Sequence, residues 1–188
     1  MALTKHKLGK LIAAVDERNR DEAVKTFYGI NIDKEFMPTL ADVSNVDAKN
    51  YKIVRTGRFV FSGMQTGRDE CIRISLYSGE DPIIISPAYM TFEVNSDLVL
   101  PEYFFMLFLR REMDRLGWFL SDGSIRANLD WEVFCDIEVD LPPIIVQRKF
   151  ANVFSALKRS EAYKSKLRDI CPILIKGAIE ESMGGNSP

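Results

Sequence analysis

The sequence predicts an α+β (mixed α/β) globular domain over residues 1–142, followed by a long C-terminal coiled-coil helix over residues 143–182. Two observations support this prediction. Before residue 142, short apolar segments are separated by glycine, proline and polar turns, which is typical of a domain rich in strands. After it, apolar side chains recur in alternating steps of four and three, the spacing of a coiled-coil stripe. Residues 183–188 are expected to be a disordered tail.

The predicted domain begins with a short amphipathic helix or turn over residues 8–15 and continues as a series of short strands. Residues 83–85 are three consecutive isoleucines, which predicts a buried strand. In residues 137–141 apolar side chains alternate with acidic ones, which predicts a last strand with one face in water. The other predicted strands are residues 27–32, 51–54, 58–61, 71–77 and 90–94, and residues 62–69 are predicted to be a polar loop flanked by glycine.

Two helices are predicted within the domain. Pro101 suits the first turn of a helix that runs to about Leu116, where Gly117 is expected to end it. A second polar loop follows over residues 121–126. Asn128 is then expected to cap a short helix that runs through Phe134.

The long C-terminal helix presents one apolar stripe, and such a stripe needs a partner to cover it. Ser160 and Lys164 fall within the stripe, so its middle is expected to pack loosely. Pro172 is expected to bend the helix near Arg168, because the proline ring clashes with that carbonyl. The residues expected to carry dimerisation are Phe150, Val153, Leu157, Leu167 and Leu174.

Composition argues against several classes of protein. The net charge is −2, no apolar run is long enough to span a membrane, and the first residues lack the apolar core of a signal peptide. The three cysteines are scattered, which speaks against disulfides and a zinc site, so the cytoplasm is the expected location. The one histidine, His6, lies near the N-terminus, and no phosphate-binding glycine motif follows a strand. We therefore expect binding rather than catalysis, with no metal or cofactor on this chain.

Basic and polar residues gather in the glycine-bearing loops. Residues 52–73 carry five basic and two acidic side chains, whereas the first fifty residues carry eight of each. Arginine forks match guanine edges and phosphates, while Gln and Asn pair with adenine, so this composition suits DNA. The alternative is that these side chains form a solvated strand face or cap turns. The candidate DNA-binding residues are Arg55, Arg58, Gln65, Thr66, Arg68, Ser124, Arg126 and Asn128.

Four stretches together resemble the specificity subunits of type I restriction–modification enzymes. They are residues 57–68 (GRFVFSGMQTGR), 85–89 (ISPAY), 123–131 (GSIRANLDW) and 137–147 (IEVDLPPIIVQ), the last leading into the long helix. Family members have Glu before the Gln that opens this helix, whereas this chain has Val146. The resemblance implies that residues 1–142 are one target recognition domain and residues 143–182 one conserved helix. Such a chain would be a half-size specificity subunit.

This resemblance also implies function and partners. The chain would recognise double-stranded DNA without catalysis, while modification subunits carry S-adenosylmethionine and methylate adenine, and a motor–nuclease subunit cleaves unmodified DNA. Two half subunits would pair their helices as a homodimer that reads a bipartite site. We expect Gln65 and Arg68 to contact bases, and Arg55, Arg58, Ser124 and Arg126 to position phosphates. Tyr89 either supports the first loop or is simply buried.

Two alternatives stay open at this point. The chain could be a coiled-coil dimeric protein-interaction module that does not bind DNA. It could also be the recognition piece of a self-contained methyltransferase, in which case another chain would have to supply the catalytic motifs.

Overall fold

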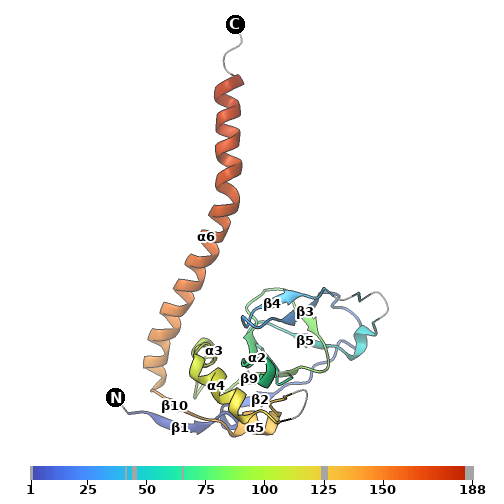
Figure 1. Cartoon of the computed structure of the whole chain (residues 1–188), viewed down its shortest axis with the longest axis vertical. Helices are drawn as coiled ribbons and strands as arrows, with labels where there is room; N and C mark the ends of the chain where they lie inside the picture. The colour runs from blue at the N-terminus through green and yellow to red at the C-terminus, as the bar shows by residue number, and fades with distance from the viewer. Residues whose placement is uncertain (1, 41, 44–45, 65, 124–126, 185–188) are drawn as a thin grey trace. The chain divides into compact units, whose positions relative to one another are not determined.

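The computed structural model describes residues 2–40, 42–43, 46–64, 66–123 and 127–184, with side chains as far as Lys176 in the C-terminal helix. The chain divides into two compact units, Met1–Arg148 and Lys149–Pro188. Figure 1 shows the chain and labels most of its helices and strands.

Two four-stranded sheets form the body of the first unit (Figure 1). The first is wholly antiparallel and has the order β2-β9-β6-β7. The second has the order β4-β3-β8-β5 and contains one parallel pair, β3 with β8. A separate antiparallel pair joins β1 to β10. The strands are β1 Thr4–Lys7, β2 Ile12–Ala14, β3 Phe27–Ile30, β4 Phe36–Pro38, β5 Lys52–Val54, β6 Phe59–Ser62, β7 Arg73–Leu76, β8 Ile83–Ile85, β9 Met90–Val94 and β10 Glu138–Leu141.

The predicted strands are present, and two of them carry the burial that their patterns predict. All three isoleucines of β8 are buried, and β10 alternates exposed and buried side chains. Residues 8–15 are only partly helical, since the single turn α1 (Leu8–Leu11) leads directly into β2. The strands β5 and β6 follow one another across Gly57, whose φ of +85° suits glycine, yet they belong to different sheets.

A cluster of aromatic rings fixes helices onto the first sheet. Phe59 of β6 stacks on Phe92 of β9 at a ring separation of 5.1 Å, and Phe104 meets both rings edge-on. Phe61 lies 4.3 Å from Phe134 on the other side of the cluster. These side chains are buried, so α3 (Pro101–Phe108) and α5 (Trp131–Asp136) are held to the sheet mainly by apolar packing.

Three local predictions for the helices are wrong. The helix predicted from Pro101 to Leu116 is two helices, α3 and α4 (Arg111–Leu120), and Gly117 lies inside α4. A Cβ at Gly117 would lie 2.4 Å from Cγ1 of Ile72, so this glycine permits close packing rather than ending a helix. The N-cap of α5 is Asp130, not Asn128. The predicted loop 62–69 contains one helical turn, α2 (Thr66–Asp69), and a 3-10 turn, η1 (Ala48–Asn50), precedes β5.

The long helix α6 runs from Ile144 to Gly184, two residues beyond the predicted end, with Pro172 inside it. Residues 185–188 of the predicted tail lie outside the described residues, and the predicted bend at Pro172 stays a prediction. No helix in the described part of the chain combines the length and apolarity that crossing a membrane requires.

The side chain of Gln147 fixes the start of α6 within the first unit. This side chain is 1% exposed. Its Nε2 donates to the carbonyls of Leu98 at 3.0 Å and Pro142 at 2.9 Å, and its Oε1 accepts from the backbone N–H of Leu100 at 3.0 Å. One amide therefore satisfies three backbone groups and ties the first turn of α6 to the segment that leads into α3.

Candidate nucleic-acid interface

Backbone hydrogen bonds join the first polar loop to residues 127–129, which follow the second polar loop. The N–H of Leu129 donates to the carbonyl of Gly63, and the N–H of Gly67 donates to the carbonyl of Ala127, each at 2.9 Å. A Cβ on Gly63 would lie 1.9 Å from the Leu129 carbonyl oxygen, and one on Gly67 would lie 2.6 Å from the Cβ of Ala127. We call this junction the loop clasp. It places residues 62–69 beside residues 127–129, although more than fifty positions separate them in the chain.

Arg68 is an exposed candidate DNA-binding residue of the first loop. Its side chain is 61% exposed, and its Nε donates to Oδ1 of Asp69 at 2.9 Å. Asp69 also pairs with Arg73. Burial opposes ionisation of Asp69, but hydrogen bonds from Arg68 and Arg73 outweigh it and lower the pKa of this carboxyl. Asp69 thus stays charged and orients the exposed Arg68 guanidinium through their hydrogen bond.

Thr66 and Asn128 form hydrogen bonds within the loops to which they belong. Thr66 is fully buried and its hydroxyl donates to the carbonyl of Gly63 at 3.0 Å, so we correct its assignment as a DNA contact. Asn128 is half-buried. Its N–H donates to Oδ1 of Asp122 at 2.9 Å and its carbonyl accepts from the N–H of Asp122 at 2.8 Å, which closes the second loop.

Arg58 lies away from any surface on which it could bind a phosphate. It is 7% exposed, its guanidinium pairs with Glu17 at 2.8 Å and Glu93 at 3.0 Å, and it donates to the carbonyl of Ile53. The assignment of Arg58 to phosphate contact is therefore corrected. Arg55 is exposed but pairs with the same carboxylate, Glu17. Hydrogen bonds from Arg55 and then Arg58 hold the pKa of Glu17 below its ordinary value.

Tyr89 belongs to the packing of the domain core, the second of the two roles expected for it. It is half-buried and packs against the core cluster that includes Ile30, Val54 and Ile85. Its carbonyl accepts from Nζ of Lys52 at 2.7 Å. Three further candidates, Gln65, Ser124 and Arg126, lie outside the described residues.

Comparisons with known proteins place this arrangement in a structural class. The chain is similar to the HsdS subunit from Thermoanaerobacter tengcongensis, with 17% identity, a TM-score of 0.56, and coverage of 95% of this chain and 49% of that one. It is also similar to the type I restriction–modification S subunit from M. genitalium, with 16% identity, a TM-score of 0.53, and coverage of 91% and 43%. A third solved structure, described as showing complex assembly and conformational transition of the type I R-M system, matches with 11% identity, a TM-score of 0.52, and coverage of 94% and 43%.

The chain has the fold of a type I specificity subunit. The sequence resemblance is thereby confirmed for the fold, namely a mixed α/β domain with a long C-terminal helix. The chain spans about half the length of the solved specificity subunits that it matches. No protein-family model matches the chain, and no curated protein matches it.

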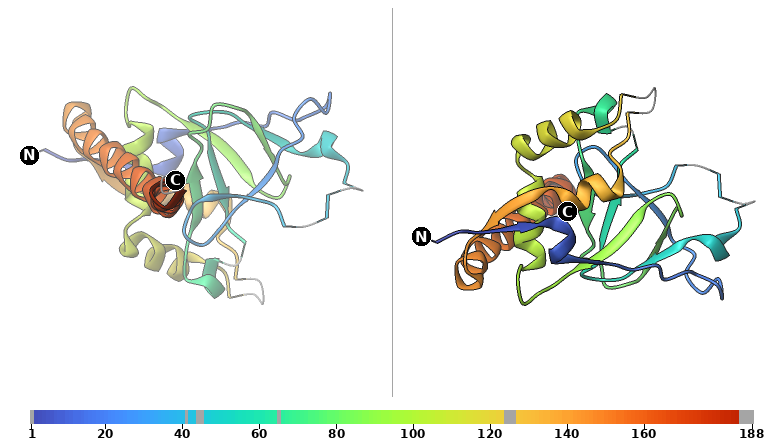
Figure 2. Two further views of the ribbon diagram at one scale, coloured as in Figure 1. Left: turned by 90° about the horizontal axis from the view of Figure 1, so that it is seen from above. Right: turned by 90° about the horizontal axis from the view of Figure 1, so that it is seen from below.

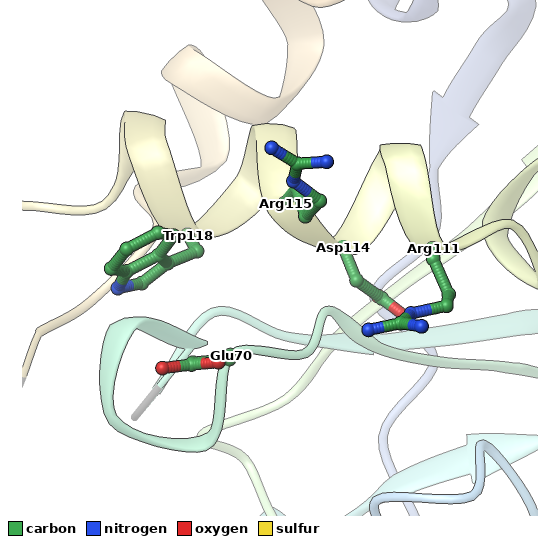
Figure 3. A pocket seen from close by; sticks show the side chains of 5 residues that line it. All are labelled: Glu70, Arg111, Asp114, Arg115 and Trp118. Atoms are coloured by element: carbon green, nitrogen blue, oxygen red, sulfur yellow. The ribbon is translucent and has the colours of Figure 1, made fainter.

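The sequence analysis did not predict one surface of this fold, an arginine-bearing face of α4. Helix α4 lies beside α2 in both views of Figure 2, and Arg111, Arg115 and Trp118 of α4 line a pocket together with Glu70 and Asp114 (Figure 3). The spacing of the two arginines and the tryptophan puts them on one helix face. That signal was hidden because residues 101–116 were predicted to be a single helix, ended by Gly117. Among the described residues there is no group of three or more His, Cys, Asp and Glu that could hold a metal ion.

The loop clasp predicts that Gly63 tolerates no side chain. Gly63→Ala should lower the free energy of unfolding by about 2 kcal/mol or more, because the new methyl group overlaps the Leu129 carbonyl and forces the loops apart. The matched control is Gly123→Ala, where an added Cβ meets no atom within 4 Å, so its effect should stay within about 0.5 kcal/mol. Urea denaturation of the two variants checks this. Equal stability of both would contradict the clasp.

Proposed function

We propose that this chain is the specificity component of a type I restriction–modification system. In this role it binds double-stranded DNA sequence-specifically and performs no chemistry itself. It directs adenine methylation by partner modification subunits, which carry S-adenosylmethionine, and cleavage by a motor–nuclease subunit where one is present. The observation that supports the proposal most directly is the loop clasp, which joins the first polar loop to residues 127–129, directly after the second polar loop, in a specificity-subunit fold.

Arg68 is the strongest described candidate for base recognition. Its guanidinium is exposed and its orientation is set by Asp69, so part of the side-chain entropy that binding would otherwise lose is already lost in the free protein. A guanidinium can donate two hydrogen bonds to the major-groove edge of guanine. We propose that Gln65 contacts a base from the same loop, and that Ser124 and Arg126 contact phosphates from the second loop.

The second unit supports the proposal of a two-fold assembly. The five side chains of the expected stripe are between 50% and 64% exposed on α6: Phe150, Val153, Leu157, Leu167 and Leu174. Apolar side chains repeated on one helix face at this spacing form a seam with a second helix. We propose that two copies pair along this stripe. A dimer with two-fold symmetry would present the two polar loops twice, once from each copy, to a bipartite DNA site.

The role of Arg68 is tested in the chain assembled with modification subunits. Arg68→Ala should cost about 1–3 kcal/mol of binding free energy on the preferred site and relax preference at one base position. Arg68→Lys is the sharper variant, because it keeps the charge and loses the two-pronged geometry. It should keep general DNA affinity yet fail to restore that base preference. Selection from a random duplex library measures both, and unchanged preference in both variants would contradict base reading by Arg68.

The dimer proposal predicts a difference between two positions of α6. Leu157→Lys places a charge in the stripe and should convert a dimer at micromolar concentration into a monomer. Ala162→Lys adds the same charge on the opposite face of the helix and should leave the dimer intact. Analytical ultracentrifugation distinguishes the two states. A wild-type chain that stays monomeric alone and with modification subunits would refute the pairing.

A further inference from the structure

Helix α4 carries two exposed arginines, and it packs against α2 of the first polar loop. Arg111 and Arg115 are exposed and separated by one helical turn, and Trp118 continues the same face (Figure 3). Neither guanidinium forms an ion pair or hydrogen bond with any residue that the structure describes, whereas Arg55 and Arg58 are both paired with Glu17. Two uncompensated cations on one face favour an anionic ligand.

The carboxylates in the same pocket do not cancel this charge. Asp114 accepts two hydrogen bonds of 2.7 Å from Nζ of the buried Lys34 and a third, of 3.0 Å, from the N–H of Ile72. Its charge is therefore matched by Lys34 and is held toward the body of the domain. Glu70 is the remaining carboxylate of the pocket, so two arginines face one acid.

Stability of α4 does not explain the arginine at its first position. Arg111 begins the helix, where the helix dipole favours negative side chains and disfavours cations. Helix α4 also packs against the first polar loop. Gly117 of α4 packs on Thr66 of α2, since a Cβ at Gly117 would lie 3.5 Å from Cγ2 of Thr66, and Arg68 lies on the same short helix.

We propose that Arg111 and Arg115 bind phosphates of the DNA backbone, so that α4 extends the reading face beyond the two loops. This inference rests on the proposed function and adds to it a positioning element. One turn of helix separates the arginines by about 6 Å along the axis, so their long side chains can reach neighbouring phosphates of one strand. The contacts hold the register of the domain on the duplex and carry no sequence information.

The salt dependence of DNA binding tests this proposal on the full chain. Affinity for a short random-sequence duplex is measured by fluorescence anisotropy over a series of salt concentrations. The double variant Arg111→Ala/Arg115→Ala should flatten the slope of log affinity against log salt by about 1.8, since each phosphate contact contributes about 0.9. Arg20→Ala is the matched control, because it removes an exposed arginine from the turn between β2 and β3 and should leave the slope unchanged.

A variant of opposite sign excludes a folding defect as the explanation. Glu70→Gln removes the one uncompensated carboxylate of the pocket and should tighten binding by about twofold or more at low salt. An arginine double variant with the slope of Arg20→Ala, or a Glu70→Gln variant that binds no tighter than wild type, would overturn the α4 site. Either result leaves the proposed function standing if wild type binds DNA and Arg68→Ala alters base preference. A wild-type chain that binds no duplex at low salt overturns both.

Discussion

The loop clasp is the constraint on which the candidate DNA-binding surface depends. Two backbone hydrogen bonds join the loop after β6 to the segment before α5, and the two glycines leave no room for a side chain between them. This junction gathers chain segments far apart in sequence onto one face. Thr66 fills the space beneath it and meets α4 at Gly117. The junction is therefore preorganised by backbone contacts, which do not depend on the identity of the exposed side chains.

The beginning of α6 depends on a different polar contact, the amide of Gln147. Burying a carboxamide that forms all three of these hydrogen bonds costs little folding free energy, whereas burying one without partners would destabilise the fold. Its partners are backbone groups of Leu98, Leu100 and Pro142, so backbone geometry rather than the identity of their side chains determines the fit. The departure from the family pattern at Val146 therefore leaves this anchor intact. The sequence pattern indicated that this segment separates the domain from the long helix. It did not indicate that the side chain of Gln147 anchors the start of that helix.

Periodicity predicted the fold better than it predicted the site. The buried strand 83–85, the half-exposed strand 137–141 and the long helix follow from patterns within a few residues, which sequence alone displays. Arg58 was misplaced because its acceptors, Glu17 and Glu93, are about forty residues away on either side. Gly117 was misread because its close neighbour, Ile72, is equally distant in sequence. Such pairings are set by tertiary packing, and the arginine face of α4 became visible only once α3 and α4 were separate.

The central claim is that this chain supplies sequence specificity to a separate methyltransferase. The most direct test maps methylated adenines in cells that express modification subunits with and without this chain. Methylation should appear at one bipartite sequence with two-fold related halves only when the chain is present, because both the reading loops and their spacing come from it. A methylation pattern that is unchanged by removal of the chain would contradict the claim.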